Sequence, residues 1–201
     1  MAGHTLYANH NTPEKIKSRQ KIYDIIASNT KRPLRVLTLP STNFALEKQL
    51  MKLSGIDVEC VEREYTIYKK ALNNCCIDKY FLGDVFDHLA SSSPYDIVWL
   101  DLCTPLTNKI INNVLYAIRG NKLLNNSLLA ITIMAAREPE GVNLAKMYNC
   151  DSLEELRIQG FPKLLSCYSK SIGKSCILND LYQYNSTGSP MIMYSFTIKN
   201  K

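Results

Sequence analysis

Short apolar runs alternate with amphipathic segments over most of the chain. Runs rich in β-branched and other apolar residues predict strands, and apolar positions three or four residues apart predict helices between them. Five strands are expected at 35–39, 56–62, 79–82, 95–101 and 127–134. Helices are expected at 43–53, 65–72, briefly through Phe86 and Leu89, and at 107–124. This alternation predicts parallel strands joined by right-handed crossovers, with helices on both faces of an open sheet.

Both ends of the chain depart from this alternation. A threonine, a proline and a glutamate at 12–14 have the order that begins a helix, which is expected to run to about residue 28. Its apolar stripe is formed by Ile16, Ile22, Tyr23 and Ile26, and its polar positions include Lys15, Lys17, Arg19 and Lys21. A helix is expected at 151–169. Two strands at 175–184 and 191–199, with Gly188 and Pro190 between them, predict an antiparallel hairpin.

The charge of the chain is unevenly distributed. Residues 1–36 carry seven basic and two acidic residues, and residues 157–201 carry six and one, so each end is +5 within a net charge of +6. Basic ends around an acidic middle favour a surface for a nucleic acid. The alternative is that these are solvated lysines on outer helices and strands. No apolar run is long enough to span a membrane and the N-terminus lacks an export pattern, so we expect a soluble, cytoplasmic protein.

The cysteines and histidines do not form a recognisable metal site. Seven cysteines have no framework spacing, and no Cys-x-x-Cys pair is present, so free thiols and no bound metal are expected. The twelve tyrosines offer a second route to nucleic-acid binding, because aromatic rings stack on bases. Packing within the hairpin is the alternative for several of them. The tyrosines considered for stacking include Tyr7, Tyr182, Tyr184 and Tyr194.

Carboxylates follow three of the expected parallel strands. Ligands of an open parallel sheet bind outside the carboxyl ends of its strands, so these residues are the candidate site. Glu62 lies 22 residues beyond Pro40, close to the interval at which an acid grips a ribose; otherwise it is an acid at the point where the chain regains solvent. Asp84 is a helix cap, a ligand-binding residue or both, since the two roles do not exclude each other. Asp101 ends an apolar strand and either binds a cationic ligand amine or forms a turn.

These features together resemble class I S-adenosylmethionine-dependent methyltransferases over about 35–199. The resemblance implies a Rossmann-like three-layer sandwich, with a mostly parallel seven-stranded sheet that ends in an antiparallel hairpin. It also implies one methyltransferase-like domain over 1–201, in which residues 1–34 are a helical extension before the core at 35–199. The implied cofactor is S-adenosyl-L-methionine. Its implied binding residues are Pro40, Ser41, Glu62, Asp84, Val85 and Asp101.

One departure from the resemblance bears on activity. The loop after the first strand, at 39–43, contains no glycine, although glycine normally lets the backbone approach the cofactor there. Methyl transfer to a nucleic acid, with Asp101 orienting or deprotonating an attacking amine, is therefore set against a non-catalytic protein that binds nucleic acid or protein. Cys103 is either a catalytic nucleophile or a small buried cysteine, and the sequence shows no basic partner near it.

Overall fold

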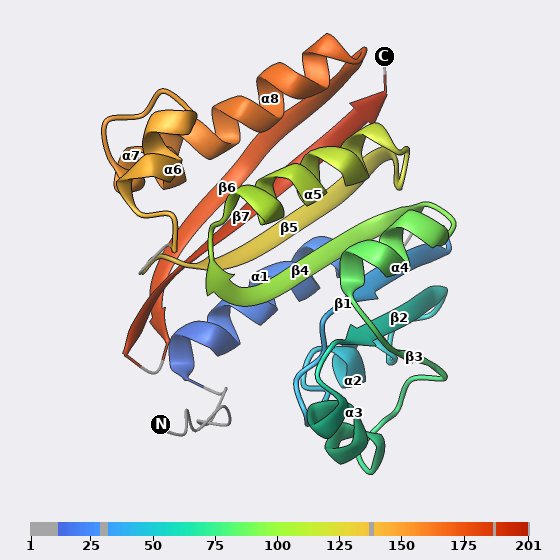
Figure 1. The fold of residues 1–201 in the computed structure, drawn as a ribbon. Coiled ribbons are helices and arrows are strands. Elements are labelled where there is room, and N and C mark those ends of the chain that lie inside the picture. Colours follow the sequence, from blue (N-terminus) through green and yellow to red (C-terminus); the bar gives the residue numbers. More distant parts are fainter. Residues whose placement is uncertain (1–11, 29–31, 137–138, 187, 201) are drawn as a thin grey trace.

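The computed structural model describes residues 12–28, 32–136, 139–186 and 188–200. Within them, seven strands form one sheet in the order β3-β2-β1-β4-β5-β7-β6 (Figure 1). The pairs β1–β2, β1–β4, β2–β3 and β4–β5 are parallel, whereas β7 is antiparallel to both of its neighbours. The strands are β1 (Leu34–Thr38), β2 (Ile56–Glu62), β3 (Lys79–Leu82), β4 (Tyr95–Pro105), β5 (Leu123–Met134), β6 (Lys174–Ser186) and β7 (Ser189–Asn200). The predicted Rossmann-like fold with a terminal hairpin is confirmed.

Helices cover both faces of the sheet, as Figure 1 shows. One core cluster joins the sheet to α4, α5 and α8, and a second joins it to α1, α2 and α3. The parallel strand β4 supplies both clusters, with Val98 and Leu100 on one side and Ile97 and Trp99 on the other. The helical elements are α1 (Pro13–Ser28), α2 (Glu47–Leu50), α3 (Tyr65–Leu72), α4 (Val85–Ser91), α5 (Asn108–Arg119), α6 (Val142–Met147), α7 (Leu153–Glu155), the π-helix η1 (Leu156–Gly160) and α8 (Phe161–Ser171).

Two helices are shorter than their apolar spacing predicts. The expected helix at 43–53 contains only α2, with turns around it, because Phe44 has a left-handed backbone (φ 52°) that interrupts an α-helix. Leu46 and Leu50 are nevertheless buried. The apolar spacing therefore predicted the buried positions correctly but overestimated the length of the helix. The helix expected at 107–124 is α5, which ends at Arg119, and β5 begins at Leu123.

The inward face of α1 differs from the predicted apolar stripe. Ile16 is 52% exposed, whereas Lys15 and Arg19 are 3% and 8% exposed. Residues 15, 19, 22 and 26 follow a spacing of four, three and four, which places both cations on the face of the buried Ile22 and Ile26. The prediction that these two cations belong to the polar face is therefore wrong.

The hairpin tyrosines pack within the protein. The Tyr182 and Tyr184 rings stack with centroids 5.3 Å apart, and Tyr194 is fully buried beside Phe161 and Phe196. Packing is thus the interpretation that the structure favours for these tyrosines, while Tyr7 lies outside the described residues. All seven cysteines lie in the described ranges and are free thiols. No helix in those ranges is long and apolar enough to cross a membrane.

Candidate active site

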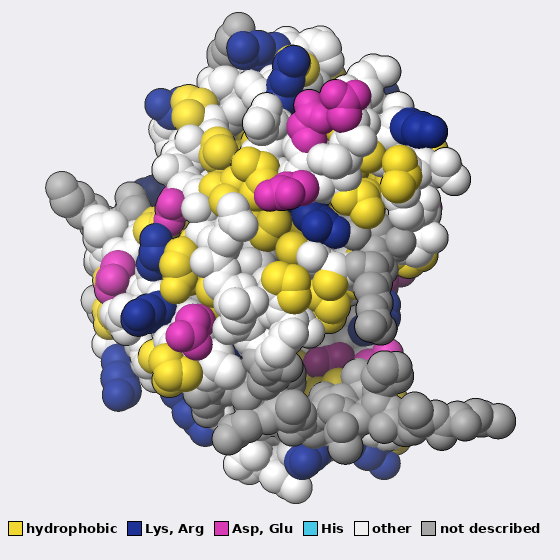
Figure 2. Space-filling model, turned by 90° about the vertical axis from the view of Figure 1, so that its left-hand side faces the viewer, with side chains coloured by type: hydrophobic (Ala, Val, Ile, Leu, Met, Phe, Trp, Pro, Cys, Tyr) yellow, Lys and Arg dark blue, Asp and Glu magenta, His cyan; other side chains and the backbone are white. Residues whose placement is uncertain are grey.

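A cavity of about 510 Å³ opens where β1, β2, β3 and β4 end. All of the residues proposed from the sequence for cofactor binding or catalysis line this cavity: Pro40, Ser41, Glu62, Asp84, Val85, Asp101 and Cys103. Figure 2 shows the molecule from the side toward which β4 points in Figure 1, and acidic, basic and hydrophobic side chains are interspersed there. The fold therefore brings four separated segments together, as the rule for open parallel sheets requires.

Glu62 is the last residue of β2 and is half-buried. Its Oε1 accepts a hydrogen bond of 2.7 Å from the Glu64 backbone N–H, which fixes the carboxylate at the strand end. Burial raises the pKa of Glu62 above its ordinary value, while that N–H partly opposes the shift. A partly desolvated carboxylate that lines a cavity is suited to accept hydrogen bonds from neighbouring hydroxyl groups.

Asp84 caps α4. Its Oδ1 accepts a hydrogen bond of 2.8 Å from the Phe86 N–H, so the capping interpretation is confirmed. The same residue lines the cavity with the buried Val85, and the β2 and β3 ends are joined by a 2.9 Å bond from the Gly83 N–H to the Glu62 carbonyl. Capping therefore holds Asp84 at the cavity wall.

The loop after β1 is fixed by its own hydrogen bonds. Ser41 Oγ donates to Asn43 Oδ1 at 2.6 Å, and the Phe44 N–H donates to the Ser41 carbonyl at 3.0 Å. The Phe44 side chain is fully buried in the core and anchors the loop there, while Pro40 and Ser41 line the cavity. The loop after β1 is thus fixed and carries side chains, whereas the family that the chain resembles usually has a glycine-rich loop at this position.

Asp101 already has a cationic partner within the chain. Lys15 Nζ lies 3.1 Å from Asp101 Oδ2, and the two side chains are 4% and 11% exposed. Burial lowers the pKa of Lys15, but Asp101 and the hydrogen bond to Cys103 together outweigh it, so the pKa of Lys15 is raised and its ammonium persists at neutral pH. The partner is supplied by α1, which precedes the region of the resemblance.

Cys103 closes a triangle with this ion pair. Lys15 Nζ donates to Cys103 Sγ at 3.1 Å, and Cys103 Sγ donates to Asp101 Oδ1 at 3.2 Å. Burial and the adjacent Asp101 charge raise the pKa of the thiol to about 12, despite Lys15. A protonated thiol is a poor nucleophile, which favours the buried-cysteine interpretation. The backbone at Cys103 is left-handed, with φ 48°.

A second buried pair of opposite charges lies one turn further along α1. Arg19 shares the face of Lys15, and its charge acts on Glu47, which is 1% exposed. Glu47 Oε1 accepts a 2.9 Å hydrogen bond from Thr38 Oγ1 at the end of β1. Burial raises the pKa of Glu47. Two buried cations of α1 thus act on two carboxylates, Asp101 and Glu47.

Four residues near the cavity were missed by the sequence reasoning: Lys15, Arg19, Glu47 and Tyr184. Burial, and then the Asp101 charge, raises the pKa of Tyr184 to about 12, which places its ring in the same environment. A signal for the two cations exists in the helical spacing of Lys15 and Arg19 with Ile22. No comparable signal marks Glu47, because its burial depends on how the loop after β1 folds back.

Sequence comparisons and structural comparisons give different results. No model of a known protein family matches the chain, and no curated protein matches its sequence. Among solved structures, the N-methyltransferase NodS from Bradyrhizobium japonicum WM9 is 9% identical with a TM-score of 0.57, covering 96% of this chain and 100% of its own. The plantazolicin methyltransferase BamL, solved with S-adenosylhomocysteine (SAH), is 14% identical with a TM-score of 0.61, covering 92% and 84%.

A third example has the same architecture. The putative methyltransferase yhhF from Escherichia coli is 10% identical with a TM-score of 0.57, and the match covers 94% of this chain and 89% of that one. Identities this low establish a shared fold only. The chain therefore has the fold of class I S-adenosylmethionine-dependent methyltransferases.

Proposed function

We propose that the chain is an S-adenosylmethionine-dependent methyltransferase that acts on a nucleic acid. The observation that carries the proposal is one cavity bordered by three acids: Glu62 at the end of β2, Asp84 just after β3 and Asp101 within β4. Its volume of about 510 Å³ falls within the range of small-molecule sites, roughly 300–1,000 Å³. The residues present fit an adenosyl group, because they combine carboxylates for hydroxyl and amino groups with apolar side chains for a base.

The chain's own residues divide the cavity into two ends. Glu62 would accept hydrogen bonds from the ribose hydroxyls, and Asp84 with Val85 would border the adenine. Pro40 and Ser41 would contact the methionine part, beside Asp101 at the acceptor end. The bound cofactor supplies a methyl group on a sulfonium, and the protein's contribution is to align this group with the acceptor.

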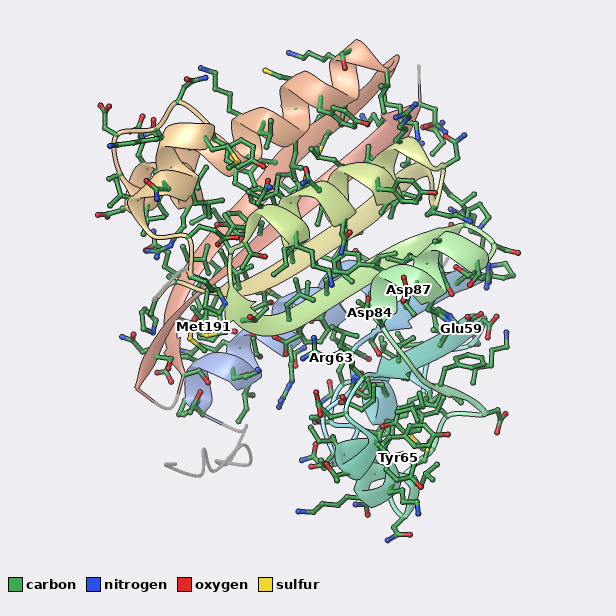
Figure 3. The ribbon with its side chains drawn as sticks, viewed as in Figure 1. Glu59, Arg63, Tyr65, Asp84, Asp87 and Met191 are labelled. Atoms are coloured by element: carbon green, nitrogen blue, oxygen red, sulfur yellow. The ribbon has the colours of Figure 1, made fainter. Side chains whose placement is uncertain are left out.

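Support for a nucleic-acid substrate comes from the cavity mouth more than from the chain ends. Much of the basic charge near the N-terminus is committed internally: Lys15 pairs with Asp101, Arg32 with Asp96, and Arg35 with Glu59. Arg63 and Lys109 are exposed and line the cavity, and Arg63 Nε lies 3.5 Å from Oε1 of its exposed neighbour Glu64. Figure 3 shows Arg63 and Asp84, which come from the segments after β2 and β3. Two exposed cations beside the site are suited to the phosphates of an entering strand.

The alternative is a non-catalytic protein of the same fold. Two observations favour it: the loop after β1 has no glycine, and an internal ammonium occupies Asp101. In that case α1 closes the acceptor end, and the surface serves to bind a partner.

Titration calorimetry with S-adenosylmethionine and SAH separates these proposals. The enzyme proposal predicts saturable binding below millimolar ligand, and no binding of either ligand at 1 mM would exclude it. Glu62→Gln is expected to weaken binding about tenfold or more, because it replaces a charged acceptor of two hydrogen bonds. Glu154→Gln, an exposed change on α7, is the control and should leave binding unchanged. Unchanged binding in Glu62→Gln would refute the ribose assignment.

The substrate class is tested by methyl transfer from labelled cofactor to total RNA and to DNA. Binding to the methylated strand should weaken steeply with salt, since phosphate contacts release counterions. Arg63→Gln with Lys109→Gln should reduce that salt dependence while leaving cofactor binding intact. Salt-insensitive transfer to a small molecule would replace the nucleic-acid proposal, whereas cofactor binding without transfer would favour the non-catalytic alternative.

A further inference from the structure

We infer that Lys15 makes the acceptor end of the cavity selective for an oxygen that reacts as an oxyanion, and selective against an amine. This inference rests on the proposed methyltransferase function and adds the chemical class of the acceptor. It also replaces the expectation that Asp101 serves an attacking amine. The observation behind it is a buried ammonium placed where a cationic acceptor would need to sit.

The Asp101 carboxylate is already satisfied. Oδ2 contacts Lys15 Nζ at 3.1 Å, and Oδ1 accepts from Cys103 Sγ at 3.2 Å. An entering amine would have to displace one of these donors to reach the carboxylate. Displacing Lys15 would leave its ammonium buried and unpaired, which is unfavourable by several kcal/mol as a general rule.

The Lys15 charge also acts directly on an acceptor. An amine that attacks the methyl group becomes a cation as the new N–C bond forms, and the Lys15 ammonium repels this developing charge. An oxygen that loses its proton gains attraction of the same order from the same ammonium. The side chains are 4% and 11% exposed, so water screens this difference only weakly.

The raised pKa of Lys15 keeps it protonated, so it cannot serve as the base. The acceptor hydroxyl instead loses its proton to water and reacts as the oxyanion. The new C–O bond forms as the C–S bond of the sulfonium breaks, and the electron pair of the broken bond remains on sulfur. Lys15 stays protonated throughout and stabilises the oxyanion, a role that an amine acceptor would not need.

Two cofactor analogues test this without knowledge of the acceptor. SAH is neutral at sulfur, whereas sinefungin carries an ammonium on carbon in place of the methylated sulfonium. This group points where the methyl acceptor would lie, so it reports how the site treats a cationic amine. The wild-type protein is expected to bind SAH at least tenfold more tightly than sinefungin. Equal binding, or tighter binding of sinefungin, would overturn the inference.

Variants of α1 assign the effect to Lys15. In Lys15→Met the ratio of the two dissociation constants should shift at least tenfold toward sinefungin, because Asp101 becomes open to the ligand ammonium. Lys15→Arg keeps the charge and should stay within threefold of the wild-type ratio. Lys17→Met removes an exposed lysine from the same helix and should change nothing. An unchanged ratio in Lys15→Met would refute the inference.

Circular dichroism and mass spectrometry complete the test. If circular dichroism shows that Lys15→Met is unfolded, Lys15→Gln takes its place, since glutamine keeps a donor without the charge. In the transfer assay, mass spectrometry should find the methyl group on an oxygen, and a methylated amine would contradict the inference. Failure of wild-type protein to bind SAH at 1 mM is a different outcome, because it removes the proposed function itself.

Discussion

Two charged networks lie at opposite ends of the central strands and serve different purposes. The Lys15 network, at the strand ends, consists of Lys15, Asp101 and Cys103. The Glu59 network, toward the strand beginnings, consists of Arg35, Glu59, Lys79, His88 and Tyr95. Figure 3 labels Glu59, in the middle of β2, apart from Arg63, which follows the end of that strand. The comparison separates charge that stabilises the sheet from charge that borders a cavity.

Both carboxylate oxygens of Glu59 accept hydrogen bonds within this network. Arg35 Nη2 donates to Glu59 Oε1 at 2.6 Å, and the Tyr95 hydroxyl donates to Oε2 at 2.7 Å. His88 Nε2 lies 3.3 Å from Oε2, while the Arg35 guanidinium lies over the Tyr95 ring. These partners come from the sheet and α4, so the network ties neighbouring elements of the core together. None of these residues lines the cavity.

The Lys15 network differs because its cation comes from a helix outside the parallel core and its members line the cavity. Near Lys15, helix α1 contacts the strand ends through charged side chains more than through apolar packing. A network at a cavity that depends on one distant lysine is suited to selecting a ligand. The stability of the fold at this end should therefore depend strongly on that lysine.

The largest predicted effect is on stability when Lys15 is removed. Lys15→Met should lower the free energy of unfolding by about 3–5 kcal/mol, because it leaves Asp101 buried without a counter-charge. Lys15→Met with Asp101→Asn should recover at least half of that loss, since the uncompensated carboxylate is gone. Urea unfolding of the four proteins in this cycle measures the coupling. Additive losses would show that the pair does not act as a unit.

The next largest effect is a loss of stability at low pH that depends on the Glu59 network. Burial opposes ionisation of Glu59, but hydrogen bonds from Tyr95, Arg35 and His88 outweigh it and lower the pKa to about 2. A carboxyl group with a lowered pKa adds stability above its ordinary value of 4.5, and loses it as the pH falls from 4.5 toward 2. The contribution is about 3 kcal/mol at neutral pH.

Glu59→Gln should therefore be less stable at pH 7 and nearly equal to wild type at pH 2. Unfolding midpoints measured from pH 7 to pH 2 give the difference curve. Glu154→Gln, an exposed acid on α7, is the control and should follow the wild-type curve. A constant difference at every pH would mean that packing, and not ionisation, accounts for the effect of Glu59.

The comparison also shows what the sequence could and could not predict. Strand alternation was sufficient for the sheet, because apolar runs such as 97–100 can be buried only between two helical layers. The acids at the strand ends followed from topology alone. The burial of Lys15 was not predicted, because a hydrophobicity pattern places lysines at the surface. A buried ion pair leaves no apolar residue in the sequence that would indicate it. The spacing of Lys15 and Arg19 with Ile22 and Ile26 was the remaining evidence.

Loop geometry was the other limit. The apolar spacing at 43–53 is correct for burial, yet the left-handed backbone at Phe44 ends the regular helix. Such a conformation depends on tertiary anchoring, here the full burial of the Phe44 ring, and single-residue preferences for helix do not include it. Burial of Glu47 follows from the same loop.

The smallest effect distinguishes strain from chemistry at Cys103. Its φ of 48° is unfavourable for a residue with a Cβ, so Cys103→Gly should be about 1 kcal/mol more stable than Cys103→Ala. Both variants lack the thiol, and a catalytic nucleophile would make both inactive in methyl transfer. Because burial and Asp101 hold the thiol protonated, we expect both to retain activity, with Cys103→Gly the more stable in urea unfolding. Loss of transfer in both folded variants would restore Cys103 as a catalytic residue and make its left-handed backbone part of how the thiol is presented to the acceptor.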